Sequence, residues 1–225
     1  MEILNELEVN IGEEQVLRRQ GYQGKLTALK SELREIMAQE IEEAYRLFHT
    51  RAVYTELKVN ETLGSEIRLS NGLVIRVGGA VRIWEGLDYL AVALGTIGPA
   101  LEDRVNDLFS LDEYPSAVML DSIGSVAADS VADQVNYLIC EKAARTGMMV
   151  GPRLSPGYGA WELKEQEVLF NLVPAQSIGV QLTESYVMIP RKSVSFCVGI
   201  GKKLTTRATS LCCRHCLKHQ CQYRR

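Results

Sequence analysis

Apolar side chains near the start of the chain recur at helical spacing. Between residues 29 and 47, leucine, isoleucine and alanine return every three or four positions, with charged residues between them. This periodicity predicts an amphipathic helix with Thr27 as its candidate N-cap. A shorter run before it, residues 13–22, predicts a helix that Gly21 stops.

Short segments rich in β-branched residues predict strands in the rest of the chain. Residues 66–77 predict a hairpin, because the Ser-Asn-Gly sequence at 70–72 is a turn signal. The other predicted strands are residues 52–59, 80–84, 87–98, 178–190 and 193–201.

Two further helices are predicted in the middle of the chain. Residues 99–109 begin with Pro99, which suits the first helical position, and residues 116–147 form a long helix that Gly147 stops. The long helix carries small residues at its inward positions: Ser122, Gly124, Ala127, Ala128, Ser130 and Ala132. They allow a backbone or a flat ligand to approach closely, and tight helix–sheet packing explains them equally well. The mixture of helices and non-alternating strands predicts an α+β fold, with a largely antiparallel sheet flanked by helices.

Composition places the chain among ordinary globular proteins. Of 225 residues, 46% are apolar and 24% charged, which suits one large domain or two small ones. The first residues are acidic and lack the apolar core of a secretory signal. The longest uncharged stretch, residues 168–183, is too short and too polar to span a bilayer. The sequence therefore predicts a cytoplasmic protein without a membrane partner.

Charge and cysteine are concentrated at the C-terminal end. After Glu184 there are nine basic residues and no acidic ones. Such a tail binds nucleic acid or the acidic surface of a partner, or it only neutralises the negative charge of the rest of the chain. Four cysteines lie within ten residues: Cys212, Cys213, Cys216 and Cys221. The spacing predicts a metal site holding zinc or an iron–sulfur cluster, with free thiols as the alternative.

Motifs for common enzyme chemistry are missing from the sequence. It has no Gly-rich phosphate loop, no metal-hydrolase helix motif and no nucleophile elbow. The loop of residues 153–160, called here the arginine loop, is more informative. The guanidinium of Arg153 precedes a Pro-Gly turn that has Tyr158 at its tip. An arginine in such a place forms a bidentate pair with a carboxylate or phosphate, or is an ordinary surface residue.

Three segments, residues 153–172, 178–190 and 193–196, together resemble the activation domain of cobalamin-dependent methionine synthase in its free-standing form. The positions that match the family pattern are Arg153, Gly157, Tyr158, Ile178, Gly179, Leu182, Thr183, Glu184, Ser185, Met188, Pro190, Ser193, Val194 and Ser195. The similarity covers most of residues 90–200. The resemblance also implies the fold, a twisted antiparallel sheet flanked by helices.

The resemblance implies a reactivation function. The family binds S-adenosylmethionine (AdoMet) and presents its methyl group to the cobalamin of methionine synthase. Oxidation leaves that cobalamin as cob(II)alamin, and one-electron reduction with methyl transfer returns it to methylcobalamin. The implied partners are methionine synthase and an electron-donating flavodoxin or ferredoxin, with no nucleic acid. The protein is thus expected to be an accessory subunit, in which the cofactors carry the chemistry.

The resemblance also implies roles for the residues of the arginine loop. Arg153 clamps the methionyl carboxylate of AdoMet, and the backbone at Ser155 bonds the adenosyl part. Pro156 fixes the loop, while Gly157 lets its backbone approach the ligand. Tyr158 faces the cobalamin and helps to position it.

Two acidic positions complete the implied site. Asp129 on the long helix is expected to pair with the ammonium or sulfonium charge. Asp133, one turn later, is the alternative for this role. Glu184 either contacts the ligand or, as a strand residue, holds the arginine loop in shape. The fused enzymes carry a carboxylate shortly before the arginine and a tyrosine after the Ser-Val-Ser strand. This chain has no carboxylate in residues 145–152 and no tyrosine in residues 196–204.

The expected organisation has three parts: an N-terminal segment of residues 1–60, an AdoMet-binding activation domain of residues 61–205 and a basic Cys-rich tail of residues 206–225. One alternative function is reactivation of another corrinoid methyltransferase. A second is a metal-binding interaction protein, although the tail lacks zinc-knuckle spacing. A third, an unrelated AdoMet methyltransferase, lacks the early Gly-rich turn of a doubly wound sheet.

Overall fold

A single antiparallel sheet organises the computed structural model, which describes residues 1–22 and 29–204. The strand order is β4-β3-β2-β5-β9-β6, and β1 also pairs with β2. The bounds are β1 (Glu2–Asn5), β2 (Arg51–Leu63), β3 (Glu66–Leu69), β4 (Val74–Arg76), β5 (Tyr89–Thr96), β6 (Met149–Val150) and β9 (Ser193–Gly201). Two more strands, β7 (Gln181–Leu182) and β8 (Met188–Ile189), form a separate hairpin.

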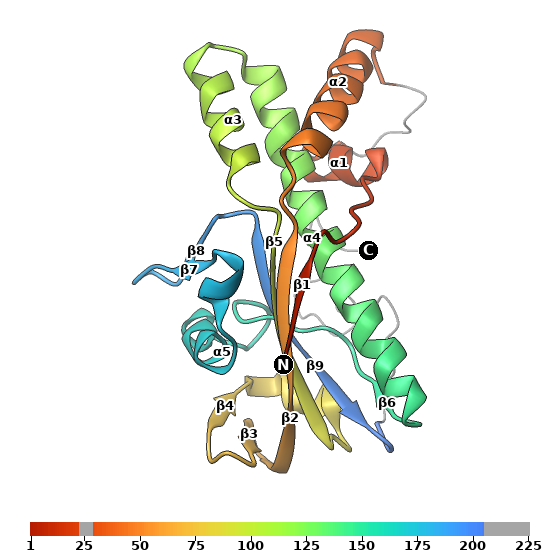
Figure 1. The fold of residues 1–225 in the computed structure, drawn as a ribbon, viewed down its shortest axis with the longest axis vertical. Coiled ribbons are helices and arrows are strands. Elements are labelled where there is room, and N and C mark those ends of the chain that lie inside the picture. The colour runs from red at the N-terminus through yellow and green to blue at the C-terminus, as the bar shows by residue number, and fades with distance from the viewer. Residues whose placement is uncertain (23–28, 205–225) are drawn as a thin grey trace.

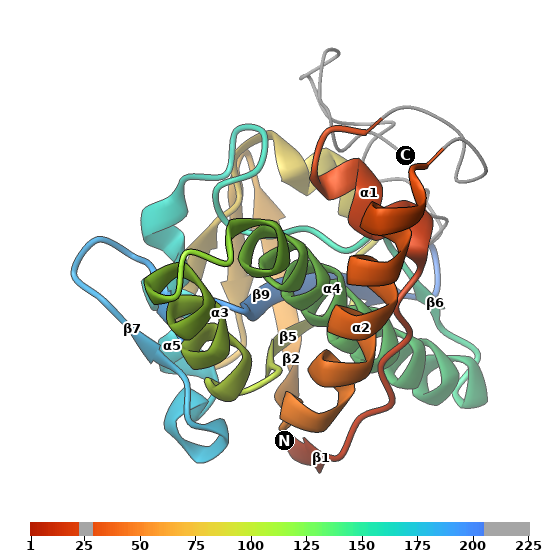
Figure 2. The same ribbon diagram turned by 90° about the horizontal axis from the view of Figure 1, so that it is seen from above.

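Helices cover both faces of this sheet. The helical bounds are α1 (Glu13–Arg19), α2 (Ser31–Leu47), η2 (Gly78–Trp84), α3 (Ala100–Ser110), α4 (Tyr114–Arg145), η3 (Leu163–Glu165), α5 (Gln166–Leu172) and η4 (Ala175–Ile178). The long helix α4 runs across one face and extends beyond the sheet, where α2 and α3 flank it (Figures 1 and 2). The α5 helix and the β7–β8 hairpin lie on the other side (Figure 1).

Alternation along β5 divides the core into two layers. Leu90, Val92 and Leu94 are buried in the layer that contains α5 and η2, whereas Ala91 and Ala93 are buried in the layer that contains α4. Successive residues of a strand point to opposite faces, so a strand covered on both sides is apolar throughout. This explains why the sequence of β5 shows no polar alternation.

Close packing accounts for much of the small-residue pattern on α4. A Cβ added to Gly124 would lie 2.6 Å from Cδ2 of Leu101, and one added to Gly95 of β5 would lie 2.7 Å from Cγ1 of Val131. These glycines allow α4 to approach α3 and the sheet. Ser130 differs, because its Oγ accepts a hydrogen bond from the backbone N–H of Asn10 at 2.9 Å.

The predicted α+β fold with an antiparallel sheet is confirmed, and two predicted strands are wrong. Residues 80–84 belong to the 3₁₀ helix η2. Residues 178–190 contain the end of η4, a left-handed Gly179 and the short β7–β8 hairpin instead of one strand. Gly21 and Gly147 follow α1 and α4 with positive φ angles, as expected for residues that stop helices. The candidate cap Thr27 lies outside the described residues.

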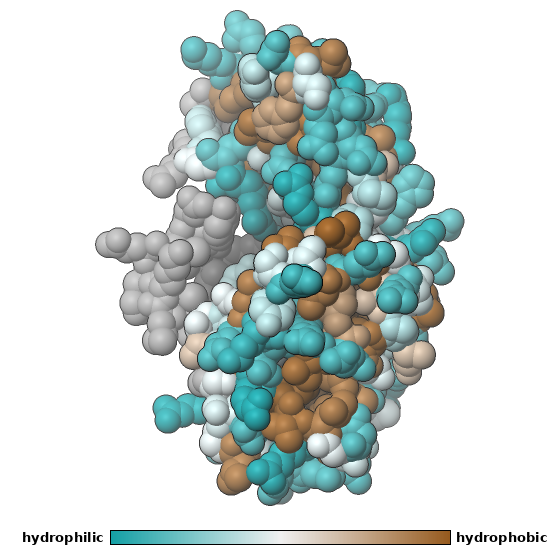
Figure 3. Space-filling model, turned by 90° about the vertical axis from the view of Figure 1, so that its left-hand side faces the viewer, coloured by the Kyte–Doolittle hydropathy of each residue, from teal (hydrophilic) through white to brown (hydrophobic). Residues whose placement is uncertain are grey.

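One face of the molecule exposes apolar surface beside the β7–β8 hairpin. Figure 3 looks onto the side that carries α5 and this hairpin, and brown surface lies between polar patches there. Val187 and Ile189 of the hairpin are exposed apolar residues, and so is Leu163 of η3, which precedes α5. Within residues 1–22 and 29–204, no helix combines the length and the apolar character needed to cross a membrane.

An ion-pair cluster attaches β1 to the sheet and to α4. The Lys142 Nζ lies 2.7 Å from Oε1 of Glu2 and 3.1 Å from Oε1 of Glu56, and 5.6 Å from the ring centroid of Tyr54. The hydrogen bond from Lys142 lowers the pKa of Glu2 below its ordinary value of 4.5. The same bond raises the pKa of Lys142.

Replacing Glu2 by glutamine is therefore expected to destabilise the protein in a pH-dependent way. A carboxyl whose folded pKa is lowered stabilises the fold above its unfolded pKa, and this contribution disappears as the pH falls through the folded pKa. Because both side chains are about half exposed, we expect a loss below about 1 kcal/mol near neutral pH. Urea unfolding of Glu2→Gln, with Glu8→Gln as control, should show a difference that vanishes in acid.

Candidate ligand-binding site

The arginine loop begins beside β9, in an extended conformation. Backbone bonds join Leu154 and Cys197 in both directions, at 2.9 and 2.8 Å. Leu154 packs in the layer that contains α5. Its neighbour Arg153 points to the opposite face, where its guanidinium lies 5.2 Å from the ring centroid of Phe196. Strand alternation thus directs the guanidinium toward α4.

Arg153 forms an ion pair with Asp133 of α4. The Nη1 atom lies 3.0 Å from Oδ1, and the side chains are 25% and 59% exposed, respectively. The two atoms are close enough for an ion pair, although Nη1 is not aligned for a hydrogen bond. Contact with the ring of Phe196 adds a cation–π interaction. The ring of Phe196 therefore supports the guanidinium of Arg153, and Asp133 of α4 pairs with its charge.

The loop turns back on itself after Arg153. The N–H of Tyr158 donates to the Ser155 carbonyl at 3.3 Å, and the N–H of Gly157 donates to the Trp161 carbonyl at 2.8 Å. Gly157 has a φ of 86°, a left-handed conformation that glycine adopts without strain. Pro156 is buried, whereas Tyr158 is 73% exposed at the tip. The loop therefore has a defined shape and presents one aromatic ring outward.

Two tryptophans support the base of this loop. The Trp161 side chain, 2% exposed, packs edge-to-face against Trp84 with ring centroids 6.2 Å apart. The Nε1–H of Trp84 donates to the Pro152 carbonyl at 2.9 Å. Gly78, at the start of η2, contacts the loop so closely that an added Cβ would overlap the carbonyl oxygen of Ala160. Trp161 therefore packs in the core and supports the loop from inside the protein.

Gln166 links the three motif segments, a supporting role that the sequence analysis did not identify. Its side-chain Nε2 donates to the Tyr186 carbonyl and its Oε1 accepts from Ser195 Oγ, both at 3.3 Å. Gln166 and Ser195 are both nearly fully buried. The available signal in the sequence was the short, regular spacing of the three motif segments, which indicates that they lie together in the fold. Polar side chains buried between such segments need hydrogen-bond partners in them.

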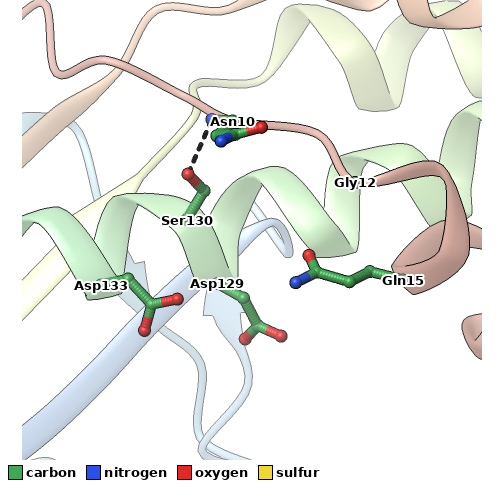
Figure 4. Close-up of a pocket in the computed structure, with 6 residues that line it drawn as sticks. All are labelled: Asn10, Gly12, Gln15, Asp129, Ser130 and Asp133. Carbon is green, nitrogen blue, oxygen red and sulfur yellow. Dashed lines mark hydrogen bonds between the residues drawn. The ribbon is translucent and has the colours of Figure 1, made fainter.

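The two aspartates on α4 have different partners. Asp129 accepts a hydrogen bond from the guanidinium of Arg19 on α1, whereas Asp133 pairs with Arg153. The structure therefore brings Arg153 to Asp133, the residue ranked second by the resemblance. Figure 4 shows both carboxylates on one side of α4.

A cavity of about 240 Å³ lies beside these aspartates. Its lining residues come from the N-terminal segment and from α4: Asn10, Gly12, Gln15, Asp129, Ser130 and Asp133 (Figure 4). Carboxylates and carboxamides dominate the lining. Such groups suit a ligand that carries positive charge or several N–H donors.

A second cavity, of about 420 Å³, lies near the start of α3. Its walls include three positions of the family pattern, Ile178, Gly179 and Pro190, together with the polar residues His49 and Arg51. Some of the motif positions after residue 177 thus line this cavity, whereas Ser195 belongs to the buried network around Gln166.

The remaining predicted residues lie apart from Arg153 or outside the described part. Glu184 is exposed in the turn between β7 and β8, so it is not a strand residue as assumed. Its contact with a ligand stays a prediction. The predicted metal ligands at positions 212–221 lie outside the described residues. Within the described part, no group of three or more His, Cys, Asp or Glu residues is arranged to hold a metal, and Cys140 and Cys197 are free thiols.

A comparison with protein families decides the assignment. The model of the "Vitamin B12 dependent methionine synthase, activation domain" family matches residues 85–205, more than half of the chain. The chain belongs to this family. The matched region contains Asp133 on α4, the arginine loop and β9, and it excludes α1, α2 and the strands β1 to β4. The resemblance drawn from the three motif segments is thereby confirmed.

A comparison with solved structures supports the same fold. One match is the crystal structure of the MetH reactivation domain bound to AdoHcy, with 14% sequence identity and a TM-score of 0.65. The alignment covers 85% of this chain and 73% of the other. The likeness therefore extends beyond residues 85–205 of this activation-domain protein and includes part of its N-terminal region.

Proposed function

We propose that this activation-domain protein binds AdoMet and supports the reductive methylation of cob(II)alamin on a cobalamin-dependent methionine synthase. The observation that carries the proposal is the ion pair between Arg153 and Asp133, at the start of the arginine loop and within the region that matches the family. The crystal structure of similar fold contains AdoHcy, the demethylated product of AdoMet.

The ion pair suits the amino-acid end of AdoMet. That end carries a carboxylate and an ammonium group close together, so a matching site needs a cation and an anion side by side. Arg153 and Asp133 provide this arrangement at 3.0 Å. We propose that the ligand carboxylate takes the guanidinium and that its ammonium takes Asp133, so the protein pair is exchanged for two ligand pairs.

The arginine loop would position the rest of the ligand. The Ser155 backbone is the proposed contact for the adenosyl part, and the bare Gly157 backbone leaves room for its approach. AdoMet supplies the methyl group that, with one electron, converts cob(II)alamin to methylcobalamin. Tyr158, exposed at the loop tip, is proposed to contact the partner's cobalamin. The protein's own contribution is binding and orientation.

The wider assembly follows from the same proposal. We infer a free-standing accessory subunit that meets the cobalamin-binding domain of methionine synthase, with a flavodoxin or ferredoxin as electron donor. The cysteines at 212–221 are proposed to bind zinc or an iron–sulfur cluster. The proposed activation domain, residues 61–205, shares its sheet with the N-terminal part, because β2 crosses residue 60.

Calorimetric titration of the anaerobically purified full chain with AdoMet tests the proposed function. We expect one saturable site, followed by AdoMet-dependent loss of the cob(II)alamin absorbance when the partner and a chemical reductant are added. Binding of AdoMet with methylation of a different corrinoid protein would redirect the partner assignment. Absence of AdoMet binding, both alone and with the cobalamin-loaded partner, would overturn the proposal.

A further inference from the structure

The segment of residues 10–19, called here the N-terminal arm, lies against α4 although it precedes the matched family region. Three contacts hold it there. The Asn10 N–H donates to Ser130 Oγ, the side chains of Val16 and Leu17 are buried in the core, and Arg19 bonds Asp129. The arm is therefore anchored at both ends and at its centre.

The arm forms half of the cavity beside the aspartates. Three of the lining residues, Asn10, Gly12 and Gln15, come from the arm, and the other three come from α4. The volume of about 240 Å³ is below the roughly 300–1,000 Å³ of complete small-molecule sites. The cavity is thus large enough for one end of a ligand such as AdoMet, and its carboxylate and amide oxygens favour the ammonium end.

Gln15 is the arm residue best placed to bind such a group. Figure 4 shows its side chain extending from α1 toward α4. Gly12 leaves space for it, because a Cβ at that position would lie 3.3 Å from Cδ of Gln15. Gln15 is exposed, so its side chain is accessible to a ligand that enters from solvent.

We infer that the N-terminal arm is part of the ligand-binding site and that Gln15 is an additional binding residue. Its side-chain carbonyl accepts an N–H of the ligand ammonium, whose charge is answered by Asp133. Residues outside the family region therefore complete the site. This inference rests on the proposed function, because it concerns the same ligand.

The test compares Gln15→Ala with Gln39→Ala, the same change at an exposed position of α2. Loss of one hydrogen bond is expected to raise the AdoMet Kd of Gln15→Ala by about 3- to 10-fold. The Gln39→Ala variant should bind like the parent. Both substitutions are on the surface, so thermal unfolding of the two variants should match that of the parent.

Hydrogen exchange gives an independent measurement of the arm. In the parent, AdoMet should slow amide exchange in residues 10–19 as well as in the arginine loop. If the parent binds AdoMet but Gln15→Ala binds equally well and exchange in the arm is unchanged, the inference is wrong while the proposed function stands. If the parent does not bind AdoMet with or without partner, the proposed function fails, and the inference with it.

Discussion

Replacing Arg153 by alanine is expected to weaken AdoMet binding by about 10- to 150-fold. The guanidinium is the cationic half of the proposed head-group site, and its removal costs about 1.5–3 kcal/mol, the usual loss for a hydrogen bond to a charged group. The ligand carboxylate would then face the ring of Phe196 without a partner. Calorimetric titration beside the parent measures the change directly.

Stability should change much less than affinity in this variant. The Asp133 side chain is 59% exposed, so water solvates its carboxylate once Arg153 is gone, and such pairs contribute about 0–1 kcal/mol. Urea unfolding without ligand is the control. An affinity equal to that of the parent would contradict the clamp, whereas a large loss of stability would show that the ion pair is mainly structural.

Removing the charge of Asp129 or of Asp133 distinguishes their roles in binding the ligand. Asp133→Asn should weaken AdoMet binding more than Asp129→Asn because, among the described residues, Asp133 pairs with Arg153 and Asp129 pairs with Arg19. The double variant Arg153→Ala/Asp133→Asn should lose less AdoMet-binding free energy than the sum of the two single losses, since both residues are proposed to contact one head group. A larger loss of affinity in Asp129→Asn than in Asp133→Asn would show that Asp129 contacts the ligand ammonium instead.

The sequence predicted the α+β fold class with its antiparallel sheet, but it did not predict which arginine pairs with which aspartate. Asp129 and Asp133 are four residues apart on a helix, so they share a face and their spacing gives no preference. The preference comes from long-range packing, in which β9 brings Arg153 to Asp133 and α1 brings Arg19 to Asp129. Neither arginine is near its aspartate in sequence.

The two wrong strands have a related explanation. Residues 80–84 and 178–190 contain β-branched and apolar residues, as strands do. Their conformation is fixed by glycines with positive φ, Gly78 and Gly179, and by packing on the layer that contains α5. Strand preference depends on context, and tertiary contacts override it. The periodic helix α4 and the fully apolar β5 carried stronger signals.

Replacing Gly78 by alanine is expected to damage both stability and ligand binding. Gly78 has a φ of 58°, where a side chain costs about 1–2 kcal/mol. The new Cβ would also overlap the carbonyl oxygen of Ala160 and lie 3.0 Å from its carbon. Both atoms belong to the backbone, so the arginine loop must shift. Overpacking of this kind adds about 1–3 kcal/mol.

A matched control separates backbone strain from displacement of the loop. Gly64, in the turn between β2 and β3, has a φ of 61°, and a Cβ added there meets nothing within 4 Å. Gly64→Ala should therefore lose about 1–2 kcal/mol of stability from strain alone and bind AdoMet like the parent.

The comparison tests whether the loop acts as a positioned unit. Because Ala160 lies between Tyr158 and the buried Trp161, its displacement moves the turn that approaches the ligand. We expect Gly78→Ala to raise the AdoMet Kd by about tenfold or more, since small misplacements of binding groups are costly. If both variants bind AdoMet like the parent at a temperature where both are folded, binding does not depend on the position of this loop, and its proposed contacts at Ser155 and Gly157 are wrong.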